Sequence, residues 1–98
     1  MSANGTESKS SALPIPHDHV IFTDLGGLEG VLVDLNTKKY YQLNETASLV
    51  WRGLERRMSI ENIAREMTEI YDVTSEQAVF SIASLLRRLH TQKLVRPG

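Results

Sequence analysis

The chain has 98 residues, a formal net charge of -1 and no cysteine. This length allows a single domain, and the missing thiols exclude disulfides, thiolate zinc sites and cysteine nucleophiles. The apolar fraction of 41% and the charged fraction of 23% are typical of a soluble globular protein. The near-neutral charge argues against nucleic-acid binding, because such domains usually carry an excess of basic residues.

The N-terminal segment is small and polar from Met1 to Ser11, and Leu13 to Pro16 follows as an extended lead-in. We expect residues 1–16 to be a disordered N-terminal segment ahead of one domain at residues 17–98. This segment has no basic region followed by an apolar one, so the sequence predicts no secretory signal. No apolar run reaches the length of a membrane span, and we expect a cytoplasmic protein.

Three strands are predicted next, over His19 to Leu25, Leu28 to Leu35 and Lys39 to Leu43. β-branched and aromatic residues are frequent in the first strand, and Gly26-Gly27 and residues 34–38 have the composition of turns. The short loops predict an antiparallel meander. The face turned away from the core is expected to carry Ile21, Leu32 and Tyr40. The other face of the second strand carries Val31, Val33 and Leu35, and the third strand has one face with Tyr41 and Leu43.

Three helices complete the predicted domain. Asn44 is the N-cap of the first, Ser59 starts the second, and Thr74 with Gln77 forms a capping box that opens the third. Apolar residues repeat at helical spacing in each helix. The buried stripes are Ala47, Val50, Trp51 and Leu54; then Ile60, Ile63, Ala64, Met67, Ile70 and Tyr71; then Ala78, Val79, Ile82, Leu85, Leu86 and Leu89. The order β-β-β-α-α-α predicts an α+β fold, a small winged-helix-like domain with a helix-turn-helix.

Catalytic and metal-binding motifs are not found. The chain has no Gly-rich phosphate loop, GxSxG or HExxH sequence, so we expect no catalytic residue, no enzyme activity and no cofactor. His17, Asp18 and His19 are residue types that bind metals. Three side chains on one short stretch cannot converge on an ion without further ligands, so we expect no metal site.

The helix-turn-helix leaves a winged-helix DNA-binding regulator as the alternative function, with Ser75 to His90 as its recognition helix. Glu76 lies at the start of that helix, where phosphates would repel it, and the chain has no basic face. Nucleic acid is therefore not an expected partner.

An open sheet edge is the best candidate for a binding site, because its N–H and C=O groups need partners. If Lys39 to Leu43 is that edge and the third helix lies beside it, the two form a groove for an extended peptide. Phe80 either lines this groove or packs under a loop. Arg87 and Arg88 either complement the helix dipole or contact an acidic peptide.

Several segments between Val20 and Val95 are shared with a known family: Val33-Asp34-Leu35, Tyr40 to Ala47 with Val50-Trp51, Tyr71-Asp72-Val73, Leu85-Leu86 and Leu94-Val95. In these segments the chain resembles the PqqD-like family (pyrroloquinoline-quinone biosynthesis protein D), a stand-alone recognition element for ribosomally synthesised, post-translationally modified peptides. It departs from the family pattern at Ser81-Ile82, Leu85 and Lys93.

The resemblance implies a non-catalytic adaptor that binds the leader of a precursor peptide. It would present that leader to a modifying enzyme, commonly a radical-SAM enzyme, as a monomer or weak homodimer away from membranes. The residues expected to contact the peptide are Lys39, Tyr40, Tyr41, Gln42, Leu43, Phe80, Ala83, Ser84, Arg87 and Arg88.

Overall fold

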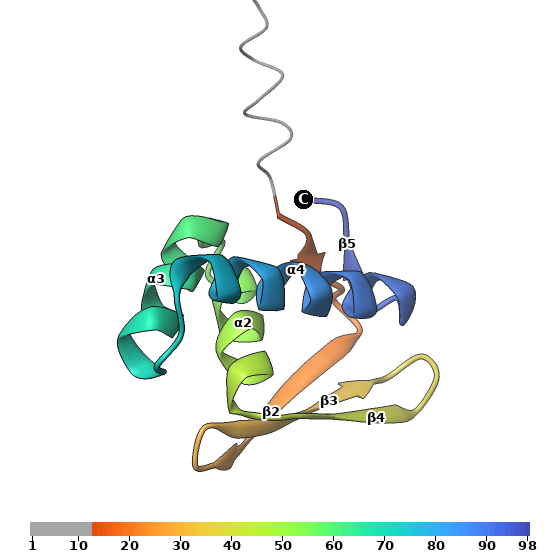
Figure 1. The fold of residues 1–98 in the computed structure, drawn as a ribbon. Helices are drawn as coiled ribbons and strands as arrows, with labels where there is room; N and C mark the ends of the chain where they lie inside the picture. Colours follow the sequence, from red (N-terminus) through yellow and green to blue (C-terminus); the bar gives the residue numbers. More distant parts are fainter. Residues whose placement is uncertain (1–12) are drawn as a thin grey trace, which may run out of the picture.

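The structure is a computed structural model that describes residues 13–98. Its elements in chain order are β1 (Ile15–Pro16), β2 (Val20–Gly26), β3 (Glu29–Asp34), β4 (Lys39–Leu43), α2 (Glu45–Glu55), α3 (Ile60–Ile70), α4 (Ser75–Thr91) and β5 (Val95–Arg96). Figure 1 shows the three helices packed together above a small sheet. The predicted fold class, a winged-helix-like α+β domain with a three-stranded sheet before three helices, is confirmed.

The three-stranded sheet is an antiparallel meander with the order β2-β3-β4, as predicted. Gly26, Gly27 and Leu28 all have positive φ in the first hairpin turn, which makes glycine useful at two of the three positions. The Asp34 carboxylate closes the second turn, since it accepts hydrogen bonds from the N–H groups of Asn36 and Thr37 at 2.9 and 3.2 Å.

A second, two-stranded sheet joins the start of the described chain to its end. Ile15 pairs with Arg96 and Pro16 with Val95, and Ile15 is buried. The folded part therefore begins before residue 17, where the sequence analysis placed the start of the domain. The disorder expected for residues 1–12 lies outside the described residues.

The prediction for the faces of β3 was wrong. Leu32 is fully buried on the core face, whereas Leu35 is 48% exposed just beyond the strand. Gly30 shares the core face, and any side chain there would overlap the ring of Phe22. Asp34 is the third buried residue of that face and serves the turn. Because a glycine and an aspartate occupy two core positions, the apolar alternation of the sequence indicated the opposite face.

The helices start where their caps predict. The side chain of Asn44 accepts a hydrogen bond from the N–H of Ala47 at 2.9 Å, and Ser59 and Thr74 cap the next two helices in the same way. Trp51 is fully buried. Two residues of the predicted stripes are exposed instead: Ile70, the last residue of α3, and Val79 on α4.

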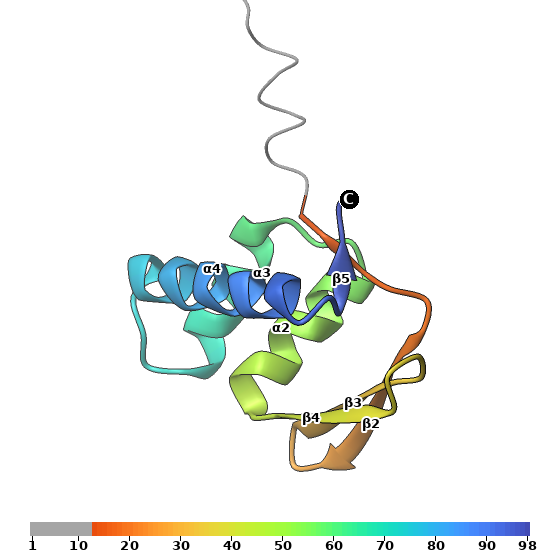
Figure 2. The same cartoon turned by 90° about the vertical axis from the view of Figure 1, so that its right-hand side faces the viewer.

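Helix α2 connects the sheet to the other helices. It leaves the end of β4 and passes beneath α4, and its buried face packs on α3, α4 and the inner face of the sheet (Figures 1 and 2). Strand β4 is thereby the sheet edge that lies on the α4 side of the molecule. No helix within residues 13–98 is long and apolar enough to cross a membrane.

Candidate functional site: a groove between strand β4 and helix α4

The outer edge of β4 is open, because no other strand pairs with it among residues 13–98. The odd-numbered residues of β3 bond toward β2, since Leu35 N–H donates to His19 C=O at 2.8 Å and the register continues along the strand. The even-numbered residues therefore bond toward β4, where their partners are Lys39, Tyr41 and Leu43. The N–H and C=O groups of Tyr40 and Gln42 are left at the open edge.

A groove with a volume of about 530 Å³ lies between this edge and helix α4. Its lining is Glu29, Tyr40, Tyr41, Gln42, Leu43, Asn44, Ala47, Leu85, Arg88, Leu89, Gln92 and Leu94. A second hollow of about 390 Å³ continues it toward the start of α4, and it adds Thr46, Val50, Phe80, Ser81 and Ser84. The two hollows share four residues and form one continuous surface.

The junction of strand and helix holds the floor of the groove in place. Asn44 ends β4 and caps α2, and the Ser48 hydroxyl donates back to the C=O of Leu43 at 3.5 Å. Ala47 lies on the groove side of this first turn and is small enough to leave room above it. The segment Leu43 to Ser48 thus joins the end of β4 to the first turn of α2 through short hydrogen bonds.

The turn that leads into β4 is held by Asp34. Burial raises the pKa of its carboxyl, but hydrogen bonds from Thr37 and Asn36 outweigh burial, and His19 adds a weaker effect in the same direction. The pKa therefore lies below its usual value, and the carboxylate is the form that the turn binds. His19 Nε2 lies 3.7 Å from this carboxylate, and the ring of His17 stacks on His19.

The groove combines apolar walls with polar side chains. Leu85 and Leu89 supply buried apolar surface, and Gln42, Asn44 and Gln92 supply amides. Arg88 is exposed where the two hollows meet, and no carboxylate of the described residues lies within 4 Å of it. An extended peptide can add to β4 by main-chain hydrogen bonds, turn alternate side chains to these walls and place an acidic group on Arg88.

Most of the predicted contact residues come together here. Tyr40, Tyr41, Gln42, Leu43 and Arg88 line the groove, and Phe80 and Ser84 line its continuation. Phe80 is 71% exposed, so it is part of the surface and not of the core. Lys39 begins the strand and is exposed without lining either hollow.

Ala83 and Arg87 line neither part of the groove, although Arg87 borders it in a small hollow that it shares with Ser84, Arg88 and Gln92. Ala83 and Arg87 both line a hollow on the other flank of α4, beside Pro14 and Pro97. On α4, Leu85 is buried with Ile82 and Leu89 as expected, whereas Val79 is exposed. The groove residues Leu85, Leu89 and Gln92 were not among the predicted contact residues. Their spacing of four and three residues, with Arg88 between them, was the available signal.

Metal ligands do not assemble in the described part of the chain, since no group of three or more His, Cys, Asp or Glu side chains within residues 13–98 could hold an ion.

The fold and the groove define a class of protein, the small winged-helix-like domain with an open strand edge beside a helix. The family model described as coenzyme PQQ synthesis protein D (PqqD) matches residues 29–95, and the chain belongs to this family. The match includes β3, β4 and all three helices, and therefore the whole groove.

Two solved structures are similar to this chain. A lasso peptide synthetase B1 complexed with the leader peptide is 27% identical with a TM-score of 0.78, over 88% of this chain and 100% of that one. TbiB1 in complex with the TbiA(beta) leader peptide is 26% identical with a TM-score of 0.75, over 83% and 93%. No curated protein matches the chain.

Proposed function

We propose that this protein is a non-catalytic adaptor that binds the leader of a ribosomally made precursor peptide in the groove between β4 and α4. The observation that carries the proposal is the open edge of β4, where Tyr40 and Gln42 offer main-chain groups beside an apolar helix. Membership of the PqqD family and the likeness to two proteins solved with leader peptides support it.

The bound leader is extended and adds one strand to the sheet. Such an interface buries less than about 1,200 Å² in total. We expect a dissociation constant of about 1 μM, which corresponds to a binding free energy of about -8 kcal/mol, because the leader must become ordered on binding. The adaptor then presents the leader to a modifying enzyme, and a radical-SAM enzyme is the partner that the family resemblance implies.

Calorimetric titration with a synthetic leader tests the proposal. Short precursor peptides encoded in the same gene neighbourhood supply candidate leaders, and a scrambled leader of the same composition is the control. The leader should bind near ~1 μM and the scrambled peptide at least tenfold more weakly. Equal binding of both would contradict the proposal, and salt-dependent binding of duplex DNA would favour a DNA-binding regulator.

A further inference from the structure

A separate hollow with a volume of about 510 Å³ lies on the side of helix α2 that faces away from the groove. We call it the α2–α3 hollow, and its apolar lining is Phe22, Leu28, Leu49, Ile70 and Tyr71. The groove takes Thr46, Ala47 and Val50 from α2, whereas this hollow takes Glu45, Leu49, Arg52 and Glu55 from the same helix. One helix therefore separates two binding-sized surfaces.

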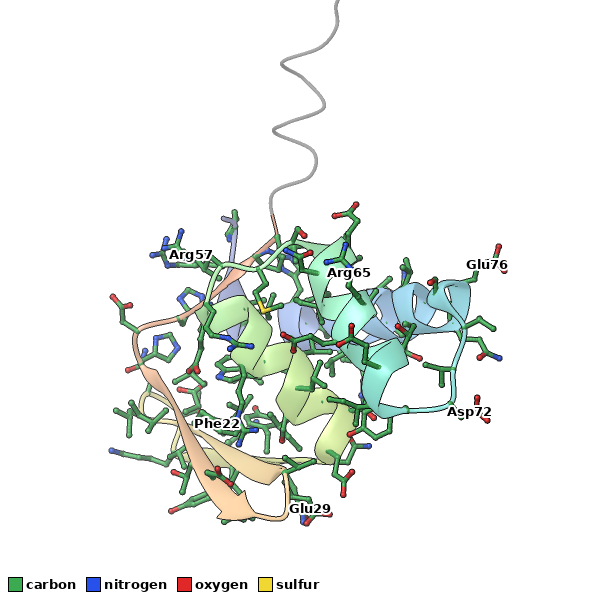
Figure 3. All side chains as sticks on the ribbon, turned by 90° about the vertical axis from the view of Figure 1, so that its left-hand side faces the viewer. Phe22, Glu29, Arg57, Arg65, Asp72 and Glu76 are labelled. Carbon is green, nitrogen blue, oxygen red and sulfur yellow. The ribbon has the colours of Figure 1, made fainter. Side chains whose placement is uncertain are left out.

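The apolar part of the α2–α3 hollow is open to solvent. Ile70 is 55% exposed and Leu28 is 48% exposed, although both are large aliphatic residues. Figure 3 faces this side of the molecule and shows Phe22 between strand β2 and helix α2. The guanidinium of Arg52 lies 5.1 Å from the centre of the Phe22 ring and makes an ion pair of 2.9 Å with Asp24, which holds that wall in place.

The charges around the hollow are unbalanced. Glu45, Glu55 and Glu66 lie on its lining with Arg52 and Arg56. Both arginines are engaged in ion pairs, Arg52 with Asp24 and Arg56 with Glu66 at 3.6 Å. Glu45 and Glu55 have no cation within 4 Å among the described residues. The hollow therefore has a net negative rim.

We propose that the α2–α3 hollow docks the modifying enzyme, which inserts an apolar side chain that is flanked by lysine or arginine. This inference rests on the proposed adaptor function, since an adaptor needs a second surface for the enzyme. The volume matches one or two large side chains, and basic flanking groups would pair with Glu45 and Glu55.

The charge also argues against two other occupants. In a symmetric dimer the same patch would face itself, and the carboxylates of Glu45, Glu55 and Glu66 would repel one another. A leader with acidic residues suits Arg88 in the groove and is repelled by the rim of the hollow.

A pair of probe peptides tests the docking surface on the full chain. One capped hexapeptide has two leucines between lysines, and the other has the same leucines between glutamates. We expect the lysine peptide to shift the NMR amide signals of Leu49, Ile70 and Tyr71 and to bind at least tenfold more tightly than the glutamate peptide. Raising the salt concentration should reduce that difference.

Matched variants locate the effect. Ile70→Ser should weaken the lysine peptide at least tenfold, whereas Val79→Ser, an exposed apolar residue outside the hollow, should leave it unchanged. Both variants should bind the leader as tightly as the native protein does. If the native protein does not bind the leader, the adaptor function is contradicted, and the peptide test of the hollow is unaffected. Equal binding of the two peptides, binding of neither, or displacement of the lysine peptide by the leader would overturn the docking proposal. The docking proposal would also be overturned if sedimentation shows that the native protein is a dimer and that the Ile70→Ser variant is a monomer.

Discussion

The groove beside β4 and the α2–α3 hollow lie on opposite sides of one helix, and they differ in the groups that remain unsatisfied. The groove offers main-chain N–H and C=O groups and the cation of Arg88, which makes no ion pair within residues 13–98. The hollow offers apolar side chains under a negative rim, and its arginines are already paired. A sheet edge suits an extended chain of varied sequence, whereas an apolar hollow suits one specific side chain.

Truncation of the core that the two regions share should have the largest effect on stability. Ile82 is fully buried on α4, behind the groove and close to α2 and α3. Ile82→Ala should lower the free energy of unfolding by about 2–5 kcal/mol, because it removes buried methyl groups and leaves a cavity. Urea titrations followed by Trp51 fluorescence and by leader binding should give coincident midpoints. Separate midpoints would show that the groove and the core around Trp51 belong to different folding units.

A proline at the open edge should affect the groove and leave the hollow intact. Gln42→Pro removes an outward N–H without breaking the ladder to β3, so leader affinity should fall at least tenfold, about 1.4 kcal/mol. Gln42→Ala keeps the N–H and should bind nearly as the native protein does. If the proline variant is folded by circular dichroism and keeps its affinity, strand addition at β4 is wrong.

Charge reversal within the groove should have a smaller effect that depends on salt. Arg88→Glu should weaken an acidic leader by up to about tenfold at low salt and by less at high salt. Arg87→Glu is the comparison variant, because Arg87 borders the groove without lining it and should matter less. Titrations at two salt concentrations measure both variants. If both variants lose the same amount of leader affinity, both arginines contact the leader.

The Asp34 carboxylate in the turn that leads into β4 predicts that the stability of the protein depends on pH. Its pKa is lower in the folded protein than in the unfolded chain, so its contribution to stability is present above about pH 3.9 and is lost as pH falls below that. Asp34→Asn should therefore lose less stability than the native protein between pH 5 and pH 3. Urea unfolding at the two pH values measures the difference, and equal losses would contradict the assignment.

The smallest effect is expected at the rim of the hollow. Burial raises the pKa of Tyr71, and the carboxylate of Glu45, which accepts a hydrogen bond from the phenol at 3.3 Å, raises it further. Glu45→Gln should lower this pKa toward its ordinary value of about 10 without reaching it, since burial remains. Ultraviolet titration against the Tyr71→Phe variant isolates the signal. An unchanged pKa would show that Glu45 does not face the phenol in solution.

The local features of this protein were determined by its sequence. Asn44, Ser59 and Thr74 cap helices because their side chains accept hydrogen bonds from N–H groups three residues away, and the turns at Gly26 and Asp34 depend on equally short contacts. The strand limits of β4 and the burial of Trp51 followed from residue type and spacing. Such features need no knowledge of distant parts of the chain.

Only the tertiary structure decided which faces meet. Leu32 faces the core because Gly30 makes room for the ring of Phe22 from the neighbouring strand. The orientation of α4 is set by packing against α2 and α3, which brings Arg88 into the groove lining and leaves Arg87 at its margin. These choices depend on contacts between residues far apart in the sequence, where several faces are apolar enough and shape complementarity selects one.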